Sequence, residues 1–198
     1  MRMRLAGRYN VENALGAMAC GALRGLSPAA MAEWMAGAEC VPGRLERVED
    51  AAGGRHVFVD YAHTPDALEN VLKTLREAAG GKRLVCVFGC GGDRDRTKRA
   101  PMGAVAAKWA DAVVLTSDNP RSEDPERILD DIAAGVPTGT EVFREADRAA
   151  AVRLGVGLAG RGDVVLVAGK GHETTQEVCG VKTRMVDREL VAAALRAG

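Results

Sequence analysis

The four residues Asp118-Asn119-Pro120-Arg121 bring a carboxylate, an amide and a guanidinium group together shortly after an apolar run over 112–116. Such a run predicts a buried strand, and in open α/β sheets ligands bind at the carboxyl ends of strands. Arg121 can hold a carboxylate through two parallel hydrogen bonds, while Asp118 and the amide oxygen of Asn119 can accept from an ammonium group. Pro120 favours an extended backbone at Asn119, which keeps the side chains apart. The set is suited to an amino-acid head group, although a polar turn also accounts for it.

Three further loops of polar and glycine residues follow predicted strands. They are Asp60 to Pro65, Gly89 to Asp95 and Gly169 to Glu173. Because parallel strands place their carboxyl ends along one edge of a sheet, we expect all four loops to meet there. Arg94 is then a second candidate for a carboxylate, and Glu173 is a candidate for an ammonium group. A surface ion pair and a helix-start carboxylate are the plainer alternatives for these two residues.

The glycines and histidines of these loops are less specific signals. Glycines near Gly89 allow the backbone to approach a ligand or an anion, but their spacing is not the dinucleotide G-x-G-x-x-G. Gly169-Lys170-Gly171 is not a phosphate loop, because no G-x-x-x-x-G-K-[ST] occurs in the sequence. His63 and His172 fit structural hydrogen bonds as well as acid–base chemistry, and we assign them no role.

The elements that position these loops alternate between strand and helix after residue 44. We expect strands over 56–60, 83–88, 112–116, 141–144, 163–167 and 183–186, and helices over 65–79, 98–110, 125–134 and 146–159 and from 188 onward. This alternation predicts an α/β fold, a Rossmann-like and mostly parallel sheet with helices on both faces. Before residue 44 the spacing predicts two helices, over 13–24 and from 28 toward 38. They form a helical stub with little core of its own.

Charge and cysteine content narrow the function classes. The 198 residues contain 27 Lys and Arg and 27 Asp and Glu, so the formal net charge is zero. This balance argues against a general binder of nucleic acid or anionic membranes. The basic cluster over 94–99 suggests a small anion or a solvated face. Five scattered cysteines without metal spacing fit a reducing cytoplasm and no metal site. We find no membrane-spanning run and no signal peptide.

Six motifs occur here in the order in which they occur in the Mur ligases of peptidoglycan synthesis, and the chain resembles that family over essentially its whole length. The motifs are Gly7-Arg8-Tyr9-Asn10-Val11-Glu12-Asn13-Ala14-Leu15, Pro42-Gly43-Arg44-Leu45-Glu46, Asp60-Tyr61-Ala62-His63-Thr64-Pro65-Asp66, Gly91-Gly92-Asp93-Arg94-Asp95, Asp118-Asn119-Pro120-Arg121 and Gly169-Lys170-Gly171-His172-Glu173. The set is most similar to the members that add meso-diaminopimelate to UDP-N-acetylmuramoyl-L-alanyl-D-glutamate.

The resemblance implies a piece of a longer ATP- and Mg²⁺-dependent ligase. Residues 1–43 resemble the last helices of the family's central, ATP-binding domain, and residues 44–198 resemble its complete C-terminal, amino-acid-binding domain. The UDP-sugar domain, the phosphate loop, most Mg²⁺ ligands and a carbamylated lysine have no counterpart here. We therefore expect the chain to be inactive alone and to work with the missing N-terminal and central domains, meso-diaminopimelate and the UDP-MurNAc-dipeptide.

The resemblance also implies roles for individual residues. The residues implied to hold diaminopimelate are Arg94, Asp118, Asn119, Pro120, Arg121, Gly169 and Glu173. The residues implied to approach ATP are Asn10 and Asn13 near the adenine and ribose, Arg44 near the γ-phosphate and Asp60 near the ribose. The family reaction passes through an acyl phosphate, and no residue is assigned here as catalytic. An arginine at 121 favours diaminopimelate over L-lysine, which lacks the distal carboxylate.

Two alternatives remain open beside this interpretation. The first is a free-standing amino-acid-binding module without catalysis, and the missing phosphate loop is the feature that separates it from a ligase. A nucleotide-dependent oxidoreductase domain would share the fold, but the glycine spacing counts against it.

Overall fold

The computed structural model describes residues 8–37, 41–51 and 53–197, with side chains from residue 10 onward. Gly7 of the first motif, the side chains of Arg8 and Tyr9, Cys40 and the expected end of the second helix at Ala38 lie outside the described residues.

A six-stranded sheet forms the body of the molecule, in the order β1-β2-β6-β3-β4-β5. Its strands are β1 (Glu46–Val48), β2 (His56–Asp60), β3 (Leu84–Phe88), β4 (Ala112–Leu115), β5 (Glu141–Arg144) and β6 (Val164–Ala168). The edge strand β1 is antiparallel to β2, and the other neighbours are parallel. The predicted Rossmann-like α/β sheet is confirmed.

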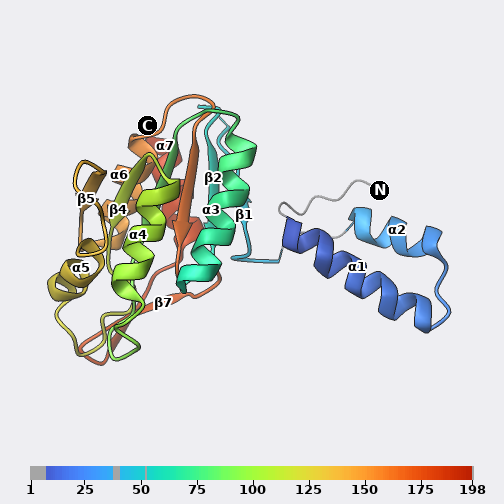
Figure 1. Ribbon diagram of the computed structural model, residues 1–198, viewed down its shortest axis with the longest axis horizontal. Coiled ribbons are helices and arrows are strands. Elements are labelled where there is room, and N and C mark those ends of the chain that lie inside the picture. The colour runs from blue at the N-terminus through green and yellow to red at the C-terminus, as the bar shows by residue number, and fades with distance from the viewer. Residues whose placement is uncertain (1–7, 38–40, 52, 198) are drawn as a thin grey trace.

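Helices cover both faces of this sheet (Figure 1). The helices α3 (Pro65–Ala79), α4 (Arg99–Trp109) and α5 (Pro125–Ala133) pack on one face, while α6 (Arg148–Gly157) and α7 (Asp187–Ala197) pack on the other. Strands β3 and β6 are buried along their whole length. Burial on both faces explains why they read as continuous apolar runs without alternation.

Local sequence signals set the helix that follows β2. Thr64 caps α3 by accepting a hydrogen bond from the main-chain N of Ala67, and Pro65 occupies the first turn. Gly80 ends the helix in the left-handed conformation with φ 56°. The expected bounds of both β2 and α3 are therefore confirmed.

The expected start of the first helix at residue 13 is wrong, because that helix begins at Arg8. The other main differences lie in short or polar segments. The structure contains β1 and β7 (Thr175–Val178), which we did not expect, and β8 spans Val181–Arg184 where we expected 183–186. The strands β7 and β8 form a separate antiparallel hairpin. Their sequences lack the continuous apolar character of the central strands, so period and hydrophobicity gave little signal.

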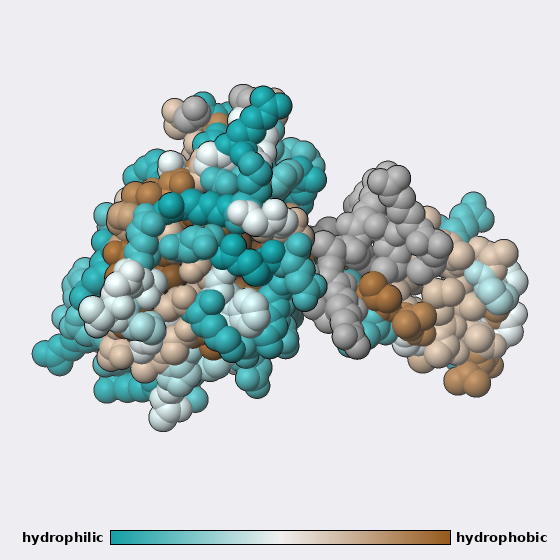
Figure 2. All heavy atoms as spheres, turned by 45° about the horizontal axis from the view of Figure 1, so that its top comes forward, coloured by the Kyte–Doolittle hydropathy of each residue, from teal (hydrophilic) through white to brown (hydrophobic). Residues whose placement is uncertain are grey.

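The first two helices, α1 (Arg8–Leu23) and α2 (Pro28–Gly37), lie to one side of the sheet (Figure 1). They pack on each other around Met31, whose sulfur would lie 2.5 Å from a Cβ placed on Gly21. Apolar side chains are exposed over this pair (Figure 2), and Leu23 is 88% exposed. Across the described ranges, no helix combines the length and apolarity that a membrane crossing requires.

Candidate functional site

The four polar loops lie along one edge of the sheet, as expected. The parallel pairing of β2, β6, β3 and β4 places their carboxyl ends side by side. Main-chain hydrogen bonds join the loops: Gly169 N donates to Asp60 O at 3.1 Å, and Gly92 N donates to Asn119 O at 3.0 Å. The edge is therefore one connected surface built from four distant segments of sequence.

The backbone of the loop after β4 differs from our expectation. Asn119 has φ 46° and Arg121 has φ 53°, so Asn119 is left-handed and the predicted extended backbone is wrong. Asn tolerates this region better than most residues, and the hairpin holds the loop in place. Arg121 N donates to Glu177 O at 3.0 Å, and Cys179 N donates to Arg121 O at 2.6 Å. These tertiary hydrogen bonds outweigh the local bias from Pro120.

The side chain of Asn119 is oriented by three hydrogen bonds. Its Oδ1 accepts from Lys170 Nζ at 3.1 Å and from the main-chain N of Glu177 at 3.0 Å. Its Nδ2 donates to Glu173 Oε2 at 2.9 Å. The amide oxygen that we considered for a ligand ammonium group thus already faces two donors of the protein. One Nδ2 hydrogen remains to donate to an incoming acceptor.

Two arginines, Arg121 and Arg94, lie close to Gly91. Arg121 Nη1 donates to Gly92 O at 2.7 Å and, at 3.4 Å, to Asn119 O. The Nε and Nη2 groups of Arg121 have no hydrogen-bond partner among the described residues. Arg94 is exposed, and a Cβ placed on Gly91 would lie 3.7 Å from Arg94 Cγ and 3.0 Å from Arg121 Nη1. The structure therefore brings both predicted carboxylate-binding residues to one glycine.

Two acidic side chains next to Asn119 contact Lys170. Asp118 is 7% exposed, and its Oδ1 lies 3.4 Å from the Nζ of the fully buried Lys170. Glu173 is half-buried and accepts from Lys170 Nζ at 3.3 Å through Oε2. A Cβ on Gly169 would lie 2.8 Å from Asp118 Oδ2, so these segments approach closely. Sequence reasoning gave Lys170 no role, because its inward direction depends on the fold.

A buried ion pair supports the edge from below. Arg148 and Asp187 have fully buried side chains, and two hydrogen bonds of 2.7 Å join them. Arg148 also donates to Ser117 O and Ala168 O at 3.0 Å, the last carbonyls before the two loops. Burial alone would lower the pKa of Arg148, but the carboxylate of Asp187 raises it. No sequence pattern identified this pair.

The basic cluster over 94–99 does not form a single solvated face. Arg99 is buried and donates to Glu123 at 3.0 Å and to Asp131 at 2.8 Å. Lys98 donates to the carbonyl of His63 at 2.7 Å. The side-chain hydrogen bond from Arg99 lowers the pKa of Glu123 to about 2. Part of the cluster therefore holds the loops together.

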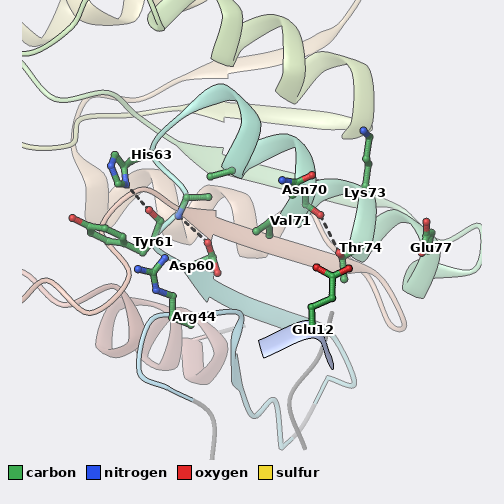
Figure 3. Close-up of a pocket in the computed structure, with 12 residues that line it drawn as sticks. Glu12, Arg44, Asp60, Tyr61, His63, Asn70, Val71, Lys73, Thr74 and Glu77 are labelled. Carbon is green, nitrogen blue, oxygen red and sulfur yellow. Dashed lines mark hydrogen bonds between the residues drawn. The ribbon is translucent and has the colours of Figure 1, made fainter. Parts of the chain in front are cut away.

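A pocket of about 590 Å³ lies beside the loop after β2. Figure 3 shows Arg44 alongside Tyr61, with the guanidinium carbon 4.9 Å from the ring centre, while Glu12 faces α3 across the pocket. The rings of His63 and Tyr61 form a T-shaped contact, with their centres 4.6 Å apart. An aromatic ring, a guanidinium group and a carboxylate suit a nucleotide better than a purely apolar ligand.

Asp60 forms the buried floor of this pocket. Its oxygens accept from the main-chain N of Leu45 at 2.6 Å and of Ala62 at 2.8 Å. Burial nevertheless raises the pKa of Asp60 above its ordinary value. Of the residues expected near ATP, Arg44 and Asp60 line the pocket, whereas Asn10 and Asn13 lie on α1 and do not line it. Within the described ranges, His, Cys, Asp and Glu side chains form no group of three that could hold a metal ion.

Comparison with known proteins gives a consistent picture. Residues 43–171 match the family described as "Mur ligase, glutamate ligase domain". The chain is 52% identical over 194 residues to a UDP-N-acetylmuramoyl-L-alanyl-D-glutamate–2,6-diaminopimelate ligase from Synechococcus elongatus, covering 98% of this chain and 39% of that protein. An enzyme of the same name from Chlorobaculum tepidum is 50% identical, with 98% and 38% covered.

Solved structures agree with these relatives. A structure of a UDP-N-acetylmuramoyl-L-alanyl-D-glutamate–2,6-diaminopimelate ligase superposes with a TM-score of 0.77 at 41% identity, covering 100% of this chain and 40% of that one. Folylpolyglutamate synthase from Mycobacterium tuberculosis, complexed with ADP and AMPPCP, superposes with a TM-score of 0.67 at 26% identity, covering 84% and 38%. The chain thus spans about two fifths of the length of the relatives it matches.

Proposed function

This chain belongs to the Mur ligase family, and we propose that it is the C-terminal portion of a ligase that adds meso-diaminopimelate to UDP-N-acetylmuramoyl-L-alanyl-D-glutamate in peptidoglycan synthesis. Relatives at 50–52% identity carry that activity in their names. Residues 44–198 would form the amino-acid-binding domain, and residues 1–43 would be the end of the ATP-binding domain. The whole ligase would act in the cytoplasm.

One observation in the structure carries this proposal: Asn119 joins a cationic side chain to an anionic one. Its main-chain oxygen accepts from Arg121, and its Nδ2 donates to Glu173. A zwitterion offers a carboxylate to the guanidinium group and an ammonium group to the free Glu173 oxygen. Diaminopimelate has a zwitterion at each end, whereas L-lysine has only an amine at its far end. The Nε and Nη2 donors of Arg121 would find no carboxylate on lysine, which disfavours that substrate.

The other proposed contacts surround this centre. Arg94 would supply a second guanidinium group from the loop after β3, and Gly169 would let the ligand approach main-chain atoms. Asp118 and Pro120 would shape the wall of the site, since both are buried. The half-buried position of Arg121 supports a role at the entrance, where its remaining donors can meet a ligand.

The pocket at Asp60 would receive part of ATP. Arg44 would approach the terminal phosphate and Asp60 the ribose, with Asn10 and Asn13 joining them in the assembled ligase. Mg²⁺ and the phosphates would be held mainly by the missing domains. The ligase would activate the D-glutamate carboxylate as an acyl phosphate, which the amine of diaminopimelate attacks. This chain would contribute mainly by binding and orienting the amine.

A chimeric ligase tests the proposal. The corresponding 39% of the Synechococcus elongatus relative is replaced with this chain, and ADP release is measured with the UDP-linked dipeptide and either meso-diaminopimelate or L-lysine. We expect turnover with diaminopimelate and a preference over lysine of at least about 100-fold in kcat/KM. The chain alone should neither hydrolyse ATP nor form the amide.

Two variants of the chimera sharpen this test. Arg121→Ala should raise the KM for diaminopimelate by about 100-fold and leave the KM for ATP within a factor of about two, because one charge-assisted pair is lost. Arg161→Ala is the matched control, since Arg161 is exposed beside Gly162 at the opposite edge of the sheet. Equal effects of Arg121→Ala on both substrates would contradict the proposed contact. Amino-acid binding without turnover would favour the non-catalytic module.

A further inference from the structure

We propose that Lys170 is a positioning residue for the amine substrate: its buried ammonium group fixes the amide of Asn119 and the carboxylate of Glu173 in the orientation that the substrate meets. The inference rests on the proposed function and adds a residue for which neither the motifs nor the binding contacts above supply a role.

The backbone around Lys170 is shaped so that its side chain lies inside the protein. Gly169 has φ 113° and Gly171 has φ 52°, conformations that L side chains rarely adopt. A Cβ on Gly171 would lie 2.7 Å from the Cβ of Tyr61, so the loop is pressed against its neighbour. Lys170 itself is 0% exposed. Burial of a lysine to this extent is unusual unless its charge is paired.

The ammonium group of Lys170 has an acceptor for each of its three hydrogens. Nζ lies 3.1 Å from Asn119 Oδ1, 3.3 Å from Glu173 Oε2 and 3.4 Å from Asp118 Oδ1. All three acceptors belong to residues of the proposed amino-acid site. Lys170 therefore differs from the lysine of a phosphate loop, which directs its charge toward a bound phosphate. The charge of Lys170 contacts side chains of the protein that form the proposed site.

These contacts set which atoms face a ligand. If the Asn119 amide were flipped, Nδ2 would face Lys170 Nζ and the main-chain N of Glu177, and Oδ1 would face the Glu173 carboxylate. All three contacts would be repulsive. Glu173 Oε2 is likewise held by Lys170 and Asn119, so Oε1 remains for the substrate. The cation thus selects an arrangement in which Asn119 offers N–H and Glu173 offers an oxygen.

Removal of the Lys170 charge should loosen this arrangement. Asn119 Oδ1 would keep only the Glu177 contact, and Glu173 would lose its charged donor. The carboxylates of Asp118 and Glu173 would then be neighbours without an intervening cation, which favours rotation of one of them away from the site. We expect weaker binding of the amine substrate with little effect on ATP, because the Asp60 pocket has no contact with Lys170 Nζ.

The experiment uses the chimeric ligase described above with Lys170→Met, which keeps an unbranched side chain one atom shorter and removes its charge. We expect the KM for meso-diaminopimelate to rise by about 10- to 100-fold, the effect of one or two charge-assisted hydrogen bonds, with kcat and the KM for ATP within about threefold. Lys82→Met is the matched control, because Lys82 is exposed at the opposite edge of the sheet. It should leave all three parameters unchanged.

A second measurement needs no turnover and uses the 198-residue chain itself. In the unsubstituted chain, the Asn119 side-chain amide should give one pair of sharp NMR signals, and the Glu177 main-chain amide should exchange slowly with solvent. Lys170→Met should broaden or shift the Asn119 amide signals and should speed the exchange of the Glu177 amide by at least about tenfold. Lys82→Met should change neither. Lys170→Arg, which keeps the charge but moves it, should give an intermediate KM if Lys170→Met does not fold.

The possible results separate this inference from the proposed function. Turnover of diaminopimelate by the unsubstituted chimera supports the function whatever Lys170 does. An unchanged KM for diaminopimelate in a folded Lys170→Met variant, or equal increases in both KM values, would overturn the inference alone. Unchanged Asn119 signals and Glu177 exchange in that variant would also overturn it.

Discussion

Replacement of Arg148 by Met should destabilise the protein far more than replacement of a surface arginine by Met does. The guanidinium group makes two hydrogen bonds to Asp187 and one each to the carbonyls of Ser117 and Ala168. The side chains of Arg148 and Asp187 are both fully buried. Methionine is unbranched, like the aliphatic stem of arginine, but it has no donor and ends before the position of the guanidinium group. The variant therefore leaves a buried carboxylate without a partner and two strand-end carbonyls without their side-chain donor.

The magnitude follows from these losses. Removing one partner of a buried ion pair destabilises proteins by about 3–5 kcal/mol, and each unsatisfied buried carbonyl adds roughly 1–3 kcal/mol, although such terms are not additive. We expect a loss of about 4–6 kcal/mol from a free energy of unfolding of about 5–15 kcal/mol. At about 2–4 °C per kcal/mol for a chain of this size, 4 kcal/mol corresponds to a decrease in Tm of about 8–16 °C.

Urea unfolding followed by circular dichroism and by tryptophan fluorescence measures this loss. The double variant Arg148→Met with Asp187→Asn should be about 1–2 kcal/mol more stable than Arg148→Met alone, because residue 187 then no longer carries an unpaired buried charge. Arg144→Met is the control: its pairs with Glu126 and Asp130 are exposed and should contribute less than about 1 kcal/mol. If Arg148→Met lost no more stability than Arg144→Met, the reasoning would be refuted.

Three further outcomes follow from the structure. Because Arg99 holds the pKa of Glu123 at about 2, below its ordinary 4.5, the stability from this pair should be present above pH 4.5 and lost as the pH falls toward 2; Glu123→Gln should flatten that part of a pH series of urea midpoints. Gly89→Ala should lower stability by about 2–4 kcal/mol in thermal unfolding, because its Cβ would overlap the main-chain oxygen of Thr116. Cys179 is exposed and should react quickly with a thiol reagent, whereas burial raises the pKa of Cys90 to about 12 and should delay its reaction until unfolding.

The fold was predictable where local and global signals agree. Thr64 and Pro65 mark the start of α3, and Gly80 marks its end, so the expected bounds match the structure. The runs that form β3 and β6 are apolar throughout, which identified them as central parallel strands. From that topology the meeting of the four loops followed without any knowledge of their side-chain contacts.

The parts that could not be predicted depend on contacts between distant residues. Lys170 lies 52 residues from Asp118 in the sequence, and its burial is visible only after both loops are in place. The left-handed backbone at Asn119 is stabilised by the hairpin that begins with β7, which has a polar sequence. No sequence pattern distinguishes a lysine that is paired inside a protein from an exposed one. Sequence reasoning therefore placed Lys170 only in a weak motif.

The position of β6 has a consequence for synthesis of the protein. This strand lies between β2 and β3, yet it is made after both of them, and after β4 and β5. Until residues 164–168 leave the ribosome, β2 and β3 each expose an apolar strand edge that has no partner. The nascent chain therefore has to delay formation of its central pairing, and it carries two aggregation-prone edges during that time. We expect this domain to depend on chaperones more than an α/β domain whose strands pair in the order in which they are made.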